Sequence, residues 1–110
     1  MEEFIKGDIV VIPFPYSDLT NAKRRPALVL AGSSNNDIIL CQITSRDTRD
    51  SYAVRLTDED FSHGKLQKES NIRPNRIFTA DAKIILYKIG SLRKEKIDEV
   101  TNIVIAIFKA

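Results

Sequence analysis

The feature that most constrains the fold is a succession of short apolar runs, each ended by residues that favour turns. Runs rich in β-branched residues and separated in this way are typical of a small barrel or sandwich. The expected strands are 8–14, 26–32, 37–44, 51–56, 70–81 and a last short one within 83–90. The polar stretch Ser33–Asn36 lies between the second and third of these, so we expect those two strands to pair as a hairpin. Pro74 marks an edge or a bulge in the fifth strand.

The periodicity changes towards the C-terminus, where one amphipathic helix is expected after Ser91, a suitable N-cap. The apolar residues that fall on a single helical face are Ile97, Val100, Val104, Ile107 and Phe108. The acidic segment 57–66 is interpreted as a solvated loop, with a single helical turn as the alternative. With 110 residues and 43% hydrophobic composition, the chain is expected to fold as one domain over 1–110.

The charge balance and the single cysteine limit the setting and the partners of the chain. A net charge of +2 is too mild to indicate nucleic-acid binding, so any electrostatic interpretation rests on local clusters. Cys41 lies inside an apolar run and is interpreted as a small buried hydrophobe in a reducing compartment. The acidic N-terminus does not resemble a secretory signal, and the longest apolar run, 103–108, is far shorter than the roughly 20 residues that span a bilayer. We therefore expect a soluble, cytoplasmic protein without a membrane partner.

Several classes of chemistry find no support in the residues. His63 is the single histidine and lies in a polar segment, so acid–base catalysis by two histidines is excluded. One cysteine and one histidine cannot build a zinc site from Cys/His pairs, and no pair of acids has a recognisable metal-ligand spacing, so no metal or cofactor is expected. The chain also has no Walker A sequence, no Gly-x-Gly-x-x-Gly motif and no Gly-x-Ser-x-Gly motif.

What remains is a set of arginines beside hydroxyl groups. Arg25 opens one strand of the expected hairpin, and the triplet Thr44–Arg46 ends the other. If the hairpin forms, Arg25 and Thr44 become neighbours at one rim of the barrel. Guanidinium and hydroxyl groups together suit a phosphate, the first for its charge and the second for its oxygens. The alternative is that Lys23–Arg25 form a solvated loop that keeps an edge strand soluble, and that the hydroxyls are ordinary strand and turn residues.

Three blocks of the sequence resemble the MazF/PemK (Kid) toxin family. The stretch "GDIVVIPFPYSDLTNAKRRPALVL" is similar to the family's N-terminal signature, in which an Arg-Pro pair opens an apolar strand. The stretch "ILCQITS" resembles its second block, and "IRPNRIFTAD" is similar to its third. Each block is short, but the three occur in the family's order and spacing, and the terminal helix also agrees. The resemblance therefore extends over nearly the whole chain.

This resemblance implies both a fold and an activity. The fold is mainly β (α+β): a small SH3-like β-barrel of the MazF/PemK/CcdB type with a C-terminal amphipathic helix, assembled as a symmetric homodimer. The activity is that of a type II toxin, a metal-independent and sequence-selective endoribonuclease that needs no cofactor. It cuts single-stranded RNA to 2′,3′-cyclic phosphate and 5′-hydroxyl ends, and a cognate antitoxin protein restrains it.

The resemblance also assigns roles to individual residues. By motif position, Arg25 corresponds to the family's catalytic arginine and Thr44 to its catalytic threonine, and Ser45, next to Thr44, is also assigned to the catalytic residues. In the Kid/PemK branch an Arg-x-Asp sequence supplies an arginine and an acidic base; here Arg73 matches the arginine, but Asn75 stands at the third position. The residues expected to bind the substrate around them are Lys23, Arg24, Arg46, Asn75 and Arg76.

Asn75 stands where the Kid/PemK branch has its acidic base, and this difference leaves several alternatives open for the mechanism. Cleavage through the ribose 2′-hydroxyl needs a group that takes its proton, and an amide does not accept a proton near neutral pH. The first is that another carboxylate such as Asp18 serves as the base. The second is that positioning of the RNA dominates over base catalysis, and the third is that the chain has lost nuclease activity. Rival interpretations are a CcdB-like toxin that binds DNA gyrase and cuts nothing, and an inactive barrel that binds RNA or a peptide.

Overall fold

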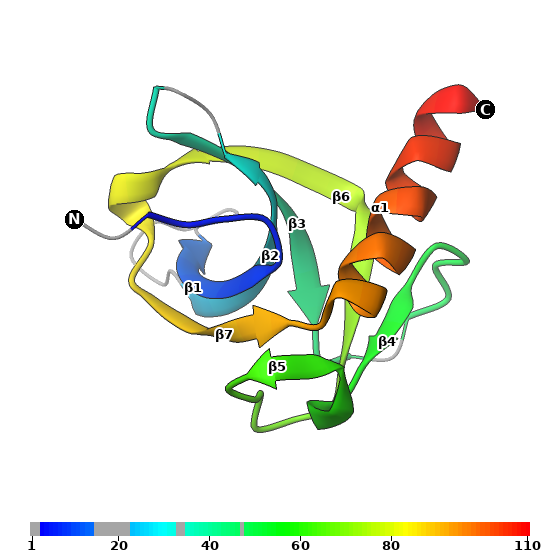
Figure 1. Cartoon of the computed structure of the whole chain (residues 1–110), viewed down its shortest axis with the longest axis horizontal. Helices are drawn as coiled ribbons and strands as arrows, with labels where there is room; N and C mark the ends of the chain where they lie inside the picture. The colour runs from blue at the N-terminus through cyan, green and yellow to red at the C-terminus, as the bar shows by residue number, and fades with distance from the viewer. Residues whose placement is uncertain (1–2, 15–22, 33–34, 47) are drawn as a thin grey trace.

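The computed structural model describes residues 3–14, 23–32, 35–46 and 48–110. Within these ranges the elements are, in chain order, β1 (Asp8–Phe14), β2 (Lys23–Gly32), β3 (Asp37–Thr44), β4 (Val54–Leu56), the 3₁₀ turn η2 (Asp58–Asp60), β5 (Phe61–His63), β6 (Ser70–Asp81), the 3₁₀ turn η3 (Ala82–Ile84), β7 (Tyr87–Leu92) and the helix α1 (Lys94–Lys109). Figure 1 shows the strands curled around one another, with α1 beside β6. In these ranges, no helix combines the length and the apolar character needed to cross a membrane.

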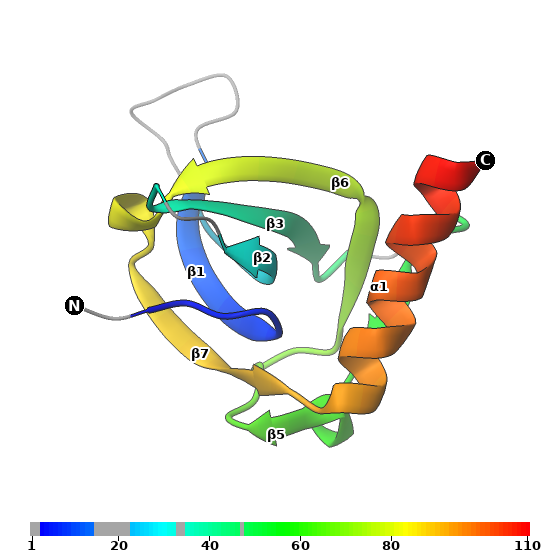
Figure 2. The same ribbon diagram turned by 45° about the horizontal axis from the view of Figure 1, so that its top comes forward.

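The described strands form one antiparallel sheet in the order β4-β6-β3-β2-β1-β7-β5. Figures 1 and 2 show that the sheet curls so far that β4 and β5, the ends of this order, both come near the start of α1. Hydrogen bonds hold them there: Lys96 Nζ donates to the carbonyl of Arg55 in β4 (3.1 Å). The Arg93 N–H donates to the carbonyl of Asp60, just before β5 (2.8 Å). The small, mainly β barrel with a C-terminal helix that the sequence predicts is confirmed.

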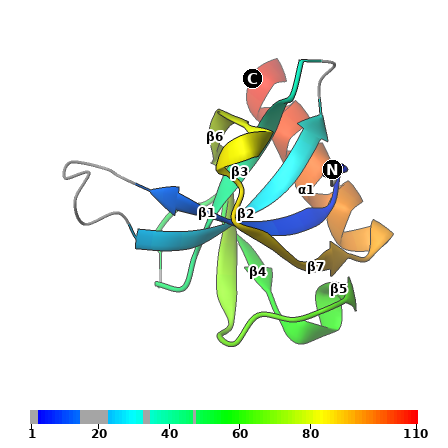
Figure 3. The same ribbon diagram turned by 90° about the vertical axis from the view of Figure 1, so that its left-hand side faces the viewer.

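Buried apolar side chains lie on both faces of the sheet, because successive strand residues point to opposite faces. On one face Leu28 and Cys41 belong to a cluster that Val100 of α1 closes, and Figure 3 shows α1 on one side of the strands. On the other face Val29 and Leu40 belong to a second cluster. Burial of each such apolar side chain contributes about 1.5–3 kcal/mol. It also raises the pKa of the Cys41 thiol to about 12, in agreement with the interpretation of this residue as a small hydrophobe.

The terminal helix starts later than expected. Its N-cap is Arg93, and Ser91 is a strand residue of β7 that pairs with Asp8 and donates its hydroxyl to the Asp8 carboxylate (3.0 Å). This strand pairing takes precedence over the capping role that the sequence suggests. The apolar face also differs, since Phe108 is 73% exposed while Ile103 packs against the first cluster.

The connections between strands hold most of the other differences. The strand expected over 51–56 is limited to β4, because the residues before Val54 form a turn in which Ala53 N–H donates to the Asp50 carbonyl (3.1 Å). The segment 57–66 is not a loop throughout: η2 is the single helical turn of the alternative, and β5 follows it. Thr57 and Asp60 close η2 through reciprocal bonds of a capping box.

The last expected strand, within 83–90, is displaced towards the C-terminus. The Asp81 carboxylate accepts the Lys83 N–H (2.9 Å) and so opens η3, where continued strand was expected. The chain pairs with β1 only from Tyr87 onwards and continues as β7 to Leu92.

Candidate active site

The hairpin of β2 and β3 forms the centre of the candidate site. Its register pairs Ala27 with Gln42 and Leu28 with Cys41, which confirms the expected pairing of these strands. The hydrogen-bonded ladder between β2 and β3 ends at Ala27 and Gln42, and Arg25 and Thr44 lie two residues beyond this last pair on their own strands. Because side chains alternate along a strand, both project to the face that carries Ala27 and Gln42. Both are partly buried.

Strand β6 brings a second arginine to this face from the other side of β3. In the ladder between these strands, Gln42 opposes Arg73 and Thr44 opposes Asn71. The three neighbouring strands β2, β3 and β6 thus carry Arg25, Thr44 and Arg73 on one face. Three of the four sequence-predicted catalytic residues therefore lie on one face, although their segments are far apart in the chain. The fourth, Ser45, follows the end of β3 and is exposed.

A carboxylate that sequence reasoning missed lies against Arg73. The Nε atom of Arg73 is 3.2 Å from Oδ2 of Asp50, and their side chains are 20% and 7% exposed. Asp50 belongs to the polar stretch Arg46–Ser51 between β3 and β4, where acids and bases alternate. No motif singles it out there, and the bend that brings it to Arg73 is a tertiary feature.

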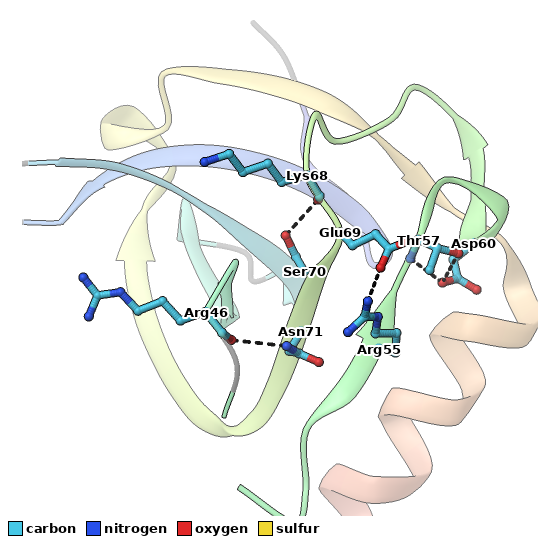
Figure 4. A network of polar contacts seen from close by, with 8 residues as sticks. All are labelled: Arg46, Arg55, Thr57, Asp60, Lys68, Glu69, Ser70 and Asn71. Carbon is cyan, nitrogen blue, oxygen red and sulfur yellow. Dashed lines mark hydrogen bonds and ion pairs between the residues drawn. The ribbon is translucent and has the colours of Figure 1, made fainter. Parts of the chain in front are cut away.

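The end of β3 is fixed by hydrogen bonds that involve the candidate threonine. The Thr44 hydroxyl oxygen accepts the Arg46 N–H (3.2 Å), and the Asn71 side-chain amide donates to the Arg46 carbonyl (3.3 Å). Figure 4 shows that the Arg46 guanidinium extends away from these contacts. Arg46 and Ser45 are both exposed, so their side chains are accessible beside Thr44.

The cations before Arg25 belong to a strand and not to a solvated loop. Lys23 pairs with Phe14 and Arg24 with Pro13, so β2 starts three residues earlier than expected. Both Lys23 and Arg24 are exposed. Because side chains alternate along a strand, Lys23 shares the face of Arg25, whereas Arg24 projects to the opposite face.

Asn75 and Arg76 lie where β6 departs from the ladder. The register with β3 shifts after Arg73, so that residues 74–76 form a bulge. Pro74 is buried there, in agreement with its expected role, whereas Asn75 and Arg76 are exposed. The structure therefore holds the two residues next to Arg73 along the chain but outside the regular pairing with β3.

The remaining candidate groups lie away from this face or outside the described residues. His63 is an exposed residue of β5, where it pairs with Ser91 at the opposite end of the strand order from β6. Asp18, the alternative base, lies outside the described residues. In the part of the chain that the structure describes, no three side chains of His, Cys, Asp or Glu gather as metal ligands would.

The whole length of the sequence agrees with one protein family. The sequence pattern of the PemK-like, MazF-like toxins of type II toxin–antitoxin systems matches residues 5–108. The chain belongs to this family. The match extends through every element of the MazF-like barrel described above, from β1 to α1. No curated protein matches the chain significantly.

The MazF-like barrel is also similar to solved structures that share little sequence with it. A chain of the MazE–MazF complex from Deinococcus radiodurans matches with a TM-score of 0.78 and 18% identity, over 96% of both chains. A mycobacterial endoribonuclease in complex with its cognate antitoxin matches with a TM-score of 0.77 and 10% identity, over 97% of this chain and 96% of that one. A MazF toxin of Mycobacterium tuberculosis matches with a TM-score of 0.72 and 17% identity, over 93% and 96%. The expected MazF-type fold is therefore confirmed.

Proposed function

We propose that this MazF-like toxin is a metal-independent, sequence-selective endoribonuclease that cuts single-stranded RNA in the cytoplasm. The observation that carries the proposal is the shared face of Arg25, Thr44 and Arg73 on three adjacent strands. Two guanidinium groups and a hydroxyl on one face suit an RNA phosphate, since guanidinium forks bind phosphate oxygens in pairs. Family membership supports the same reaction class.

The proposed reaction is an internal transfer within the RNA. The ribose 2′-oxygen loses its proton and attacks the adjacent phosphorus, the bond from phosphorus to the 5′-oxygen breaks, and that oxygen takes up a proton. The products are a 2′,3′-cyclic phosphate and a 5′-hydroxyl. Arg25 and Arg73 stabilise the charge that accumulates on the phosphorane. Thr44 donates its hydroxyl hydrogen to a phosphate oxygen, while its own oxygen accepts the Arg46 N–H.

Charge stabilisation and positioning supply most of the proposed rate enhancement. The Asn75 amide does not take the 2′-hydroxyl proton at neutral pH. Preorganised cations next to a developing charge contribute as much as general bases do, and an aligned internal nucleophile removes most of the entropy cost. Catalysis therefore does not require that Asn75 act as a general base. A carboxylate placed to accept the 2′-hydroxyl proton would raise the rate.

The exposed residues around this face are proposed to hold the RNA. They are Lys23, Arg46, Asn75 and Arg76, together with Ser45 next to Thr44. Arg24, which is also expected from the sequence to bind the substrate, projects to the opposite face of β2 and is not included. Contacts of cations with phosphates release counterions, so binding should weaken steeply with salt. An acidic antitoxin segment that folds on binding would compete for the same cations.

We also propose that the toxin acts as a homodimer. Exposed apolar side chains on α1, Ile105 at 44% and Phe108 at 73%, are the kind of surface that a subunit contact covers. Sedimentation velocity at micromolar concentration tests this directly, and a species of monomer mass alone would contradict it.

The experiment for the proposed activity uses the purified chain, a pool of single-stranded RNA and excess EDTA. Cleavage at a preferred sequence with 5′-hydroxyl ends is the expected result. Ends that carry a 5′-phosphate would make water the nucleophile and overturn the mechanism. An intact RNA pool, together with inhibition of DNA gyrase, would favour the CcdB-like alternative.

Competition tests the antitoxin proposal separately. A non-cleavable RNA analogue with a fluorescent label should be displaced by the cognate antitoxin peptide, as measured by fluorescence anisotropy. Simultaneous binding of both with undiminished affinity would mean that inhibition acts from another surface.

A further inference from the structure

Asp50 is a nearly buried carboxylate for which the proposed chemistry has no role. Its side chain is 7% exposed, although it lies in a polar connection between β3 and β4. Carboxylates are rarely buried unless a cation or several hydrogen bonds compensate for the lost hydration. The contacts of Asp50 therefore indicate what it does.

The local chain holds Asp50 in one orientation. Its N–H donates to the Thr48 hydroxyl oxygen (3.1 Å), and its carbonyl accepts the Ala53 N–H (3.1 Å). Its Oδ1 atom accepts the Tyr52 N–H (2.9 Å). These bonds fix both the backbone and the carboxylate plane of Asp50 before any substrate binds.

The remaining oxygen of this carboxylate fixes Arg73. Oδ2 lies 3.2 Å from Arg73 Nε, so the Nε–H edge of the guanidinium is engaged by Asp50. A guanidinium is planar, and a bond at Nε sets the orientation of the whole group, including its terminal Nη atoms. Because Arg73 opposes Gln42 beside Thr44, the oriented group belongs to the face proposed to bind the phosphate.

This geometry argues against Asp50 as the general base. Both carboxylate oxygens already accept hydrogen bonds, and little of the side chain is accessible to a 2′-hydroxyl. The negative charge also offsets part of the charge of Arg73, so this arginine contributes defined geometry more than net charge.

We propose that Asp50 is a positioning residue of the RNA-cleaving site, which holds the Arg73 guanidinium so that its Nη edge can bind the scissile phosphate. The inference rests on the proposed ribonuclease function. Small misplacements of a group that contacts the reacting atoms cost up to about a hundredfold in rate. Replacement of the Asp50 carboxylate should therefore lower kcat and leave the affinity for RNA largely unchanged.

The central test compares Asp50→Asn with the wild type on an RNA that contains one cleavage site. We expect kcat to fall by about tenfold to a hundredfold, with KM and the binding of a non-cleavable RNA analogue changed by less than about threefold. The matched control is Glu99→Gln, which removes a half-exposed carboxylate that pairs with the mostly buried Lys96 on α1, away from the candidate site, and should leave kcat unchanged. Wild-type kcat in Asp50→Asn would overturn the proposal.

Two further variants separate positioning from base catalysis and from misfolding. Arg73→Lys keeps the charge but lacks the Nε edge, so it should lose nearly as much kcat as Arg73→Ala; wild-type kcat in Arg73→Lys overturns the proposal even if Asp50→Asn fails to fold. The double variant Asp50→Asn/Arg73→Ala should be no slower than Arg73→Ala alone, because both changes remove the same element. If instead the kcat losses of the two single variants multiply in the double variant, Asp50 has an independent role as the base.

A spectroscopic measurement distinguishes failure of this inference from failure of the proposed function. The Arg73 Nε–H signal in NMR should exchange slowly with water in the wild type and rapidly in Asp50→Asn. If the wild type cuts no RNA, the ribonuclease proposal fails and the catalytic role of Asp50 fails with it, while the NMR result still reports whether the ion pair exists. If RNA is cut but the Nε–H exchanges rapidly in the wild type, only the positioning role fails.

Discussion

Lys88 Nζ lies 3.2 Å from Asp8 Oδ1, so an ammonium group of β7 meets a fully buried aspartate at the start of β1. The same carboxylate accepts the Ser91 hydroxyl (3.0 Å) and, through Oδ2, the Ile5 N–H (3.0 Å). Asp8 thereby joins the N-terminal turn, β1 and β7 at one point. This accounts for the aspartate of the Gly-Asp pair in structural terms, without a part in catalysis.

Replacing Asp8 with Ala should lower the free energy of unfolding by about 2–4 kcal/mol, because it leaves buried donors without an acceptor. Urea denaturation measures the change. Glu69→Ala is the control, since its ion pair with Arg55 is largely exposed and such pairs contribute little. A similar change in the free energy of unfolding in both variants would mean that the buried hydrogen bonds of Asp8 stabilise the fold no more than an exposed ion pair does.

Gly90→Ala should destabilise the barrel by about 1–3 kcal/mol. A Cβ on Gly90 would collide with the carbonyl oxygen of His63 and come within 3.0 Å of Gly64 Cα, where β5 and β7 pass closely. Gly32→Ala serves as the matched control, because among the described residues its Cβ would come near the Phe4 carbonyl oxygen alone, at 3.7 Å. Thermal unfolding of the two variants should differ clearly; equal melting temperatures would contradict the close approach.

Arg25→Ala should lower the rate of RNA cleavage by about a hundredfold or more, since in the proposed mechanism it removes a guanidinium that stabilises the phosphorane. Thr44→Ala should cost less, because a neutral hydrogen bond contributes less than a charged one. Arg93→Ala, at the start of α1, is the matched arginine control and should keep both activity and fold. Unfolding of Arg25→Ala in circular dichroism would show that the residue supports the core instead of the site.

Asn75→Asp should increase the cleavage rate by about tenfold or more, because it restores a carboxylate beside Arg73 where the related Arg-x-Asp sequence has one. Single-turnover kinetics at neutral pH measure the gain. Asn75→Gln retains an amide and should show no increase. An unchanged rate in the aspartate variant would place the proton acceptor elsewhere in the chain.

Cys41 should resist alkylation in the folded protein. Burial raises the pKa of its thiol to about 12, so at pH 8 only about one molecule in ten thousand carries the reactive thiolate. Iodoacetamide followed by mass spectrometry should label Cys41 in urea but not in buffer. Rapid labelling of the native chain would show that the first cluster opens readily.

Most of the strands, and the pairing of β2 with β3, could be predicted from local patterns. The runs 8–14, 37–44 and 70–81 are strands with the expected bounds, because β-branched residues and flanking turn residues act over a few positions. The pairing of β2 with β3 places Arg25 and Thr44 on one face of the sheet, each two residues beyond the last pair of the ladder. This shared face could be predicted from the sequence, since alternation along paired strands determines which side chains share a face.

What could not be predicted depends on contacts between distant segments. Ser91 has the character of an N-cap, but its partner Asp8 is at the other end of the chain. Asp50 is one of several charged residues in its connection, and only the bend after β3 brings it to Arg73. The residues 83–90 are apolar enough for a strand, yet the Asp81 carboxylate turns the chain first. In each case a long-range or capping bond overrides the local preference.

The bulge at Pro74–Arg76 divides the pairing of β6 with β3 into two ladders. The part before it carries Arg73 and pairs with β4 as well as β3, whereas the part after it places Phe78 and Ala80 against the second cluster. A bulge absorbs an added residue without shifting the pairs on either side. Changes in length at this point can therefore move the part of β6 that carries Arg73 relative to the core while the barrel keeps its register. The proposed RNA site can thus be reshaped without a new fold having to be stabilised.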